Sequence, residues 1–293
     1  MLLLALTLGL GRSFSTEHNS LVGDPVVGGR LYDNWMAELD LPPPDGDQPL
    51  WADQTSNTRS GRITWRCKEC HGWDYKGAQG AYGPAALRYT GFPGVNGVVG
   101  NSLGQITAWL DGTSNPNHNF LAITNPAAVE DLAAFLLTMQ IDTSLVVDPQ
   151  TGAAYGDEQS GAILYANNCA DCHGSTGRSI NFEAAGSPVY LGDVALIDPW
   201  RTVHKIRFGI PGSGKLAAEE AGWSLREVAD VLAFMQSFPR GNPNYTIQRP
   251  EAELASAEAQ GEMEPIIWAA SAMIAIVALG LGWDAFEKRP RRS

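Results

Sequence analysis

The chain has 293 residues, a formal net charge of −12 at pH 7 and an isoelectric point near 4.8. This length suffices for two modest domains. The acidity argues against a nucleic-acid partner, because binding to phosphates requires a basic surface. It favours solubility and a protein partner with a basic docking face, although charges that merely solvate the surface explain it equally well.

The N-terminal part of the chain begins with a short apolar run, residues 2–10. This run has the length of the apolar region of a signal peptide and is too short to span a bilayer. No basic stretch precedes it and no clear A-x-A cleavage pattern follows, so we interpret residues 1–20 as a signal segment of atypical form. Residues 21–58 are rich in Pro, Asp and Trp without sustained periodicity, and we expect an extended arm that packs on the next domain.

Two copies of one pentapeptide contain all four cysteines of the chain, CKECH at 67–71 and CADCH at 169–173. C-x-x-C-H is the attachment signature of c-type haem, in which each thiol adds to a vinyl group and the histidine becomes the proximal iron ligand. We therefore predict two covalently bound haem c groups. Their attachment residues are Cys67, Cys70, Cys169 and Cys172, and the proximal ligands are His71 and His173.

Other uses of these cysteines fit the pattern less well. Disulfides are possible in an exported chain, but they need no histidine after each cysteine pair. A structural zinc site usually has its two C-x-x-C pairs closer together in sequence. A thioredoxin-like redox pair would need a βαβ context, which neither motif has.

Each motif is followed by an amphipathic segment at nearly the same distance, residues 129–136 after the first motif and 227–235 after the second. The second segment begins with a capping box, Ser224 with Glu227, and we expect it to end at Pro239. Before the second motif, Gly161, Tyr165 and Cys169 share one face of a predicted helix. The matching spacings predict a tandem duplication of one helical unit.

These features resemble the class I cytochromes c, in which a glycine and an aromatic residue of the first helix cross an aromatic-bearing last helix. The resemblance covers roughly residues 59–246. The first unit departs from it, because Gly61 is present but Trp65 lies close to Cys67, so we expect a short or distorted entry helix. The implied fold class is mainly α, with two tandem class I cytochrome c domains, 59–145 and 146–246, plus one C-terminal transmembrane helix.

The C-terminal part suggests a membrane anchor. Residues 265–283 contain no charge and approach the ~20 residues of a spanning helix. An Ala/Glu-rich linker, 247–263, precedes the predicted transmembrane helix 264–283, and a basic tail, 284–293, follows it. The positive-inside rule places this tail in the cytoplasm. We therefore expect single-pass attachment to the bacterial cytoplasmic membrane, with the haem domains in the periplasm.

The sixth ligand of each iron decides the chemistry of a haem. In the resembled family this ligand, usually Met, lies in the loop before the last helix. In the first unit that loop is 111–120, and His118 stands where the methionine is expected. The alternative role of His118 is that of an exposed loop histidine, but its position and the absence of methionine from this loop favour ligation, with Met139 at the helix end as the second candidate ligand.

The corresponding loop of the second unit, 209–217, contains no methionine. Lys215 has the position of His118 but must lose its proton to bind iron. His204 has suitable chemistry but lies earlier in the chain, and Met235 lies in the last helix. We favour His204, with a hydrogen bond to a haem propionate as its alternative role, and an open five-coordinate iron also fits the sequence.

The predicted function is electron relay between a membrane oxidoreductase or reaction-centre complex, respiratory or photosynthetic, and a redox partner, with no catalytic residues. The alternative is a diheme enzyme of the cytochrome c peroxidase type that uses an open second haem. A thiosulfate dehydrogenase would need a cysteine ligand, and no cysteine is spare. A purely structural or docking subunit would not need two intact attachment motifs.

Overall fold

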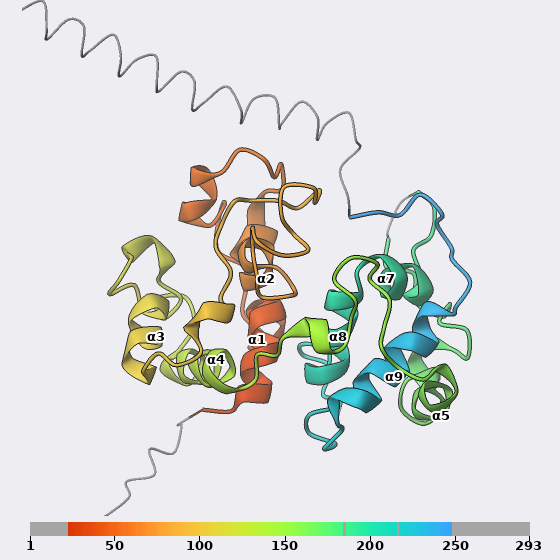
Figure 1. Cartoon of the computed structure of the whole chain (residues 1–293). Coiled ribbons are helices and arrows are strands. Elements are labelled where there is room, and N and C mark those ends of the chain that lie inside the picture. Colours follow the sequence, from red (N-terminus) through yellow and green to blue (C-terminus); the bar gives the residue numbers. More distant parts are fainter. Residues whose placement is uncertain (1–22, 184–185, 216, 248–293) are drawn as a thin grey trace, which may run out of the picture.

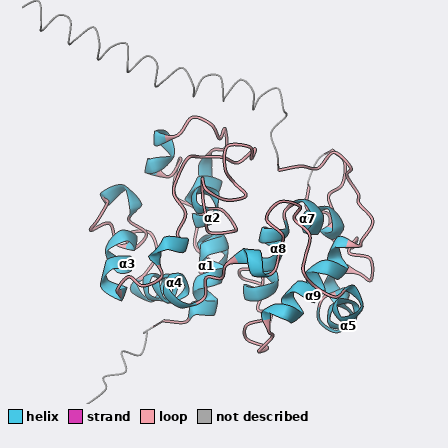
Figure 2. Ribbon diagram, viewed as in Figure 1, coloured by secondary structure: helices cyan, strands magenta, loops and turns pink. Residues whose placement is uncertain are grey.

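The computed structural model describes residues 23–183, 186–215 and 217–247, and these residues fold into helices joined by long loops (Figures 1 and 2). The α-helices are α1 (Pro25–Glu38), α2 (Cys67–His71), α3 (Leu103–Leu110), α4 (Pro126–Thr138), α5 (Glu158–Asn168), α6 (Ala170–His173), α7 (Leu191–Ile197), α8 (Pro199–Phe208) and α9 (Leu225–Gln236). Short 3-10 helices are η1 (Pro49–Asp53), η2 (Gly61–Trp65), η3 (Asn96–Val98), η4 (Pro116–His118) and η5 (Thr143–Leu145).

Two pairs of helices organise the fold, α1 with α4 and α5 with α9. Figure 1 shows the first pair and α3 on one side of the molecule, and α5, α7, α8 and α9 on the other. Each pair belongs to its own hydrophobic core. We call the part built on α1 and α4 the first unit and the part built on α5 and α9 the second unit.

A glycine lets the two helices of each pair cross closely. A Cβ atom on Gly28 would lie 2.0 Å from the carbonyl oxygen of Asp131, and one on Gly161 would lie 1.9 Å from that of Asp230. Neither position can accept a side chain without moving the helices apart. The two crossings are therefore built in the same way.

The hydrogen bonds around the two crossings also correspond. The Tyr32 hydroxyl donates to the Gly72 carbonyl (2.5 Å), and the Tyr165 hydroxyl donates to that of Gly174 (2.7 Å). Both glycines directly follow a C-x-x-C-H motif, so each tyrosine ties the first helix of its unit to the end of the motif helix. Hydroxyls buried this deeply need such partners.

The helix starts follow from local sequence. The side chains of Asp24 and Asp157 accept backbone N–H groups at the first turns of α1 and α5. The predicted capping box of Ser224 and Glu227 is present at the start of α9. The helices expected around 129–136, 161–169 and 227–235 are confirmed as α4, α5 and α9, and α9 ends at Gln236, just before the predicted Pro239.

The segment 21–58 was predicted to be an extended arm, but part of it is helical. Its residues 25–38 form α1, which supplies the helix that crosses α4. The predicted entry helix at Gly61–Trp65 is only the 3-10 helix η2. The first helix of the first unit thus lies well before its cysteines, and residues 39–66 separate the two. The predicted first domain, 59–145, does not include this helix.

The two units are packed against each other through α1 and α8. Phe208 of α8 is fully buried in the core of the first unit, and its ring lies 5.2 Å from that of Phe135. A Cβ atom on Gly29 would lie 2.4 Å from the Phe208 ring. Lys205 of α8 forms an ion pair with the buried carboxylate of Asp33. The contact therefore combines apolar burial with a charged pair.

The predicted fold class and localisation need a correction. No helix within residues 23–183, 186–215 and 217–247 is long and apolar enough to cross a membrane. The predicted transmembrane segment 264–283 lies outside these residues, as do the signal segment 1–20, nearly all of the linker 247–263 and the tail 284–293. The transmembrane helix is therefore withdrawn from the fold class, and the single-pass membrane localisation with periplasmic domains is withdrawn with it.

Candidate haem sites

The first motif forms the short helix α2, which brings its two thiols and its histidine to one pocket. Cys67, Cys70 and His71 line this pocket, and both cysteines are half-buried. Gly72 ends the helix with φ = 74°, a left-handed conformation that favours glycine. Burial raises the pKa of the Cys67 thiol and of the Cys70 thiol to about 12, so both are protonated at neutral pH.

His118 lies in the same pocket and faces His71. The Nδ1 atom of His71 lies 2.7 Å from the Pro93 carbonyl oxygen, and Nδ1 of His118 lies 2.8 Å from that of Trp109. A carbonyl can only accept, so each Nδ1 carries the hydrogen and each Nε2 keeps a free lone pair. This is the tautomer in which Nε2 binds a metal, with the second hydrogen bond fixing the ring.

Both histidines are held neutral. Burial lowers the pKa of His71 to about 4, with a smaller opposing effect of the Pro93 carbonyl, and burial also lowers the pKa of His118. Metal ligation requires this neutral form.

The separation of the two rings fits one iron between them. Their centroids are 6.3 Å apart, with an angle of 72° between the ring planes. Two imidazole nitrogens on opposite sides of one metal, each at about 2.0–2.1 Å and each about 1.1 Å from its ring centre, place the centres roughly 6.2–6.4 Å apart. The separation of His71 and His118 is therefore compatible with the predicted ligation of one iron by both rings.

The rest of the pocket suits an apolar macrocycle. Its walls include Leu50, Trp65, Phe92 and Phe120. The 39–66 segment helps to close it, because the Gln48 amide donates to the carbonyl of Asn117, beside His118 (2.7 Å). The residues of this pocket therefore fit a covalently attached haem.

The second motif lies where α5 runs into α6. Cys169 ends α5 and is half-buried, and Cys172 is exposed. Gly174 ends α6 with φ = 76°, matching Gly72. Burial lowers the pKa of His173, whose buried Nδ1 has no hydrogen-bond partner among the described residues. The pKa of both motif histidines is thus lowered by burial, but only His71 has a hydrogen-bond partner at Nδ1 among the described residues.

A comparison with protein families concerns this second unit. The family described as "Cytochrome C oxidase, cbb3-type, subunit III" matches residues 156–235, from the start of α5 to the end of α9. Residues 156–235 are a cytochrome c domain. A cytochrome c domain implies covalently bound haem c, and Cys169, Cys172 and His173 lie within the matched range. No curated protein matches the chain significantly.

His204, favoured as the sixth ligand of this cytochrome c domain, is placed elsewhere. It is 1% exposed in the contact between the units, with Nδ1 at 2.7 Å from the Tyr75 hydroxyl and Nε2 at 2.9 Å from the Gly29 carbonyl oxygen. The carbonyl accepts from Nε2–H, so Nδ1 accepts from Tyr75. With both nitrogens engaged, the ligand role does not fit, and neither does the propionate contact.

The contacts of the other candidate haem ligands, among the described residues, do not support a ligand role. Lys215 is exposed, and its backbone N–H donates to Ser213 Oγ. Met235 is buried in the core of the second unit on α9. Met139 follows α4 and packs beside the core of the first unit. Lys215 and Met235 stay predictions for the second haem.

All four cysteines are free of disulfides. Within the described ranges there is no cluster of three or more His, Cys, Asp or Glu side chains of the kind a structural zinc site needs.

Sequence inspection missed several residues of the first site. The carbonyls of Pro93 and Trp109 and the amide of Gln48 have no sequence signature. Tyr32 does have one, since Gly28 and Tyr32 repeat the i, i+4 pair of Gly161 and Tyr165. The long segment before Cys67 concealed this repeat.

Proposed function

We propose that this protein is a diheme c-type cytochrome that relays electrons between a larger respiratory or photosynthetic complex and a redox partner. The observation that carries the proposal is the pairing of His71 with His118 at 6.3 Å, inside a pocket that also holds Cys67 and Cys70. The correspondence between the helix crossings at Gly28 and Gly161 supports a second haem site of the same kind in the cytochrome c domain.

Bound haem supplies one-electron chemistry between ferric and ferrous iron. Cys67 and Cys70 would hold it covalently, and His71 and His118 would bind its iron through their neutral Nε2 atoms. The carbonyls of Pro93 and Trp109 keep both rings in place during electron transfer. Two histidine ligands favour a lower potential than a His/Met pair, because Met raises it.

The partner is proposed to be a redox protein complex. The matched family carries an oxidase subunit in its name, which is consistent with delivery of electrons to or from an oxidase. The formal charge of −12 favours a basic docking face on the partner. Electron relay needs no substrate pocket and no catalytic residue.

One observation keeps the peroxidase-type enzyme as a second candidate. The hydrogen bonds of His204 to Tyr75 and Gly29 remove the favoured ligand from the second iron, and an iron without a sixth ligand can bind small molecules. Rapid binding of one equivalent of carbon monoxide by the untreated ferrous protein would favour the enzyme, and no binding would favour the carrier.

Counting haems in the purified holoprotein tests the carrier proposal. We expect the mass of two covalent haems and a matching haemochrome absorbance. Replacing both cysteines of either motif by alanine should remove one haem and leave the other. A single haem in the unchanged protein would contradict the proposal.

A redox titration of His118→Met then tests the ligand pair. We expect one wave to rise on the order of 0.1 V, because axial ligands set haem potentials over a range of ≈ 0.8 V. The other wave should stay nearly unchanged. If neither reduction potential shifts in His118→Met, ligation by His118 is refuted.

A further inference from the structure

The loop that follows α8, residues 209–215, corresponds in the second unit to the loop of His118 in the first. Each loop connects the helix before the last to the last helix of its unit, α3 to α4 and α8 to α9. Each begins at a glycine in the left-handed region, with φ = 84° at Gly112 and φ = 83° at Gly209. His118 of the first loop lies in one pocket with the motif histidine His71. If the second unit holds a haem as proposed, this correspondence assigns loop 209–215 to the side of the iron opposite His173.

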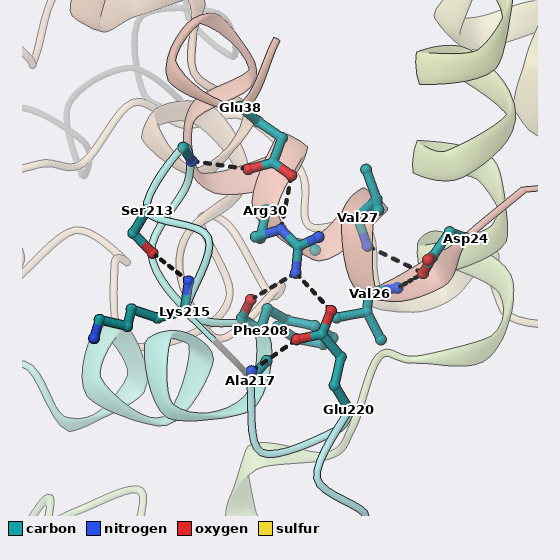
Figure 3. A network of polar contacts seen from close by, with 12 residues as sticks. Asp24, Val26, Val27, Arg30, Glu38, Phe208, Ser213, Lys215, Ala217 and Glu220 are labelled. Atoms are coloured by element: carbon teal, nitrogen blue, oxygen red, sulfur yellow. Dashed lines mark hydrogen bonds and ion pairs between the residues drawn. The ribbon is translucent and has the colours of Figure 1, made fainter. Parts of the chain in front are cut away.

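Side chains of the first unit hold this loop (Figure 3). The Glu38 carboxylate of α1 accepts the backbone N–H of Gly212 at 2.9 Å, and its other oxygen is 2.7 Å from Nε of Arg30. Nη1 of Arg30 donates to the carbonyl of Phe208, where the loop begins (3.4 Å). One ion pair on α1 thus contacts both the start and the middle of the loop.

The far end of the loop is connected to the same arginine. Nη1 of Arg30 lies 3.3 Å from a carboxylate oxygen of Glu220, and the other oxygen of Glu220 accepts the backbone N–H of Ala217 at 2.8 Å. Ala217 itself is buried in the core of the first unit, as Phe208 is. Three points of the loop region are therefore fixed on the neighbouring unit.

The contact sets one arginine against two glutamates, and its charges are partly protected from water. The side chains of Arg30 and Glu38 are 15% and 13% exposed. Hydrogen bonds to charged groups in such surroundings are stronger than those between neutral groups. The ion pair between Arg30 and Glu38 therefore stabilises the observed conformation of the loop over others.

We propose that Arg30 and Glu38 are positioning residues for the second haem, although they belong to the first unit. They fix the backbone of loop 209–215 and with it whatever group the loop presents to the iron. The spin state and potential of the second haem then depend on the contact between the units. This inference rests on the proposed function, because it requires a haem in the second unit.

Glu38→Ala in the full holoprotein tests the proposal, because it removes the acceptor of the Gly212 N–H group and the counter-ion of Arg30. Hydrogen exchange in the peptide that covers 209–215 should accelerate roughly tenfold, as expected for loss of one charge-assisted hydrogen bond. The paramagnetic resonance signal and the reduction wave of the second haem should shift. The second haem is identified as the one that His118→Met leaves unchanged.

Two further variants complete the experiment. Glu38→Gln keeps an acceptor for Gly212 and should restore most of the exchange protection and of the second-haem spectrum. Arg226→Ala is the matched control, because it removes an ion pair between the exposed Arg226 and the buried carboxylate of Asp230 in the second unit without touching the loop. It should leave both haem signals unchanged.

Unaltered exchange in 209–215 and an unaltered second-haem spectrum in Glu38→Ala would overturn the inference, as would equal shifts of both haems. The haem count decides the proposed function separately, and two haems with an insensitive loop would overturn the inference alone. If Glu38→Ala does not fold, Arg30→Lys serves as the milder variant. It should shift the second-haem signal in the same direction to a smaller extent.

Discussion

At the scale of single residues, the surroundings of a histidine decide its role more than its position in the chain. His71 and His118 each donate from Nδ1 to a carbonyl and keep Nε2 free. His204 uses both nitrogens, with Tyr75 on one side and Gly29 on the other. The first two are therefore equipped to bind a metal, whereas His204 joins the two units as a neutral hydrogen-bonding group.

The buried His204 makes stability depend on pH. Burial lowers its pKa to about 3 in the folded protein, against about 6.5 in the unfolded chain. Between these values the unfolded state binds more protons, so stability falls as the pH falls, by up to roughly 1.4 kcal/mol per pH unit. His204→Gln should be less stable at pH 7, by about 1–3 kcal/mol, but its stability should fall less steeply.

Denaturant unfolding of both proteins at pH 7, 6 and 5 checks this expectation. The unfolding free energy of the unchanged protein should exceed that of His204→Gln at pH 7, and this difference should shrink by roughly 1–2 kcal/mol from pH 7 to pH 5. The other histidines are common to both proteins and cancel in the comparison. If the unfolding free energies of the two proteins changed in parallel with pH, His204 would not be a buried neutral group.

At the scale of elements, each unit depends on a helix crossing closed by a glycine. Gly28 lies on the backbone of α4 at Asp131, and Gly161 lies on the backbone of α9 at Asp230. The backbone is the obstacle at both crossings, so no flexible side chain can move aside to make room. Intrinsic helix propensity would favour alanine at these positions, and packing overrides it.

Gly161→Ala should lower the free energy of unfolding by about 1–3 kcal/mol, because the added methyl group forces α5 away from α9. Gly104→Ala on α3 is the matched control, since a Cβ atom there meets nothing within 4 Å. It should be neutral or stabilising by roughly 0.5–1 kcal/mol. Thermal or denaturant melts measure both, and equal effects of the two substitutions would refute the close crossing.

At the scale of the whole molecule, the two units share buried surface and are not independent. Phe208 and Ala217 of the second unit lie in the core of the first. Trp73 and Tyr82, which follow the first motif, lie in the core of the second. The Tyr82 hydroxyl also forms a hydrogen bond with the buried Asp198 carboxylate. Unfolding one unit therefore exposes part of the other.

Phe208→Ala should cost about 3–5 kcal/mol, because it leaves a cavity against Gly29 and Phe135 at the centre of this contact. Ile163→Ala, at a side chain that is 64% exposed, should change stability by less than about 0.5 kcal/mol. Calorimetry should show one cooperative transition for the unchanged protein. Two separate transitions, with Phe208→Ala affecting neither, would contradict a shared core.

The sequence alone predicted features that rest on local chemistry. C-x-x-C-H places thiols and histidine on one helical turn, so α2 and α6 could be predicted with their roles. The cap of α9 at Ser224 and the amphipathic pattern of α4 are also local. His118 was predicted as a ligand because its loop position follows from the order of helices. Its ring geometry with His71 agrees with that prediction.

Contacts between distant segments could not be predicted in this way. The role of α1 as the partner of α4 was hidden by residues 39–66, although the Gly28 and Tyr32 pair was visible in the sequence. His204 was misassigned because its two partners, Gly29 and Tyr75, lie in the other unit. No periodicity or spacing in the sequence indicates that His204 contacts Gly29 and Tyr75.

Local sequence was enough to predict the two attachment motifs, the helices around them and the pairing of His71 with His118 in one pocket, because residues close in the chain or at a fixed place in a repeated unit specify them. The shared core of the two units and the contacts of Arg30 and Glu38 with the loop of the second unit are visible only in the folded structure. Packing and ion pairing depend on which surfaces meet in space, and that meeting is a property of the folded chain.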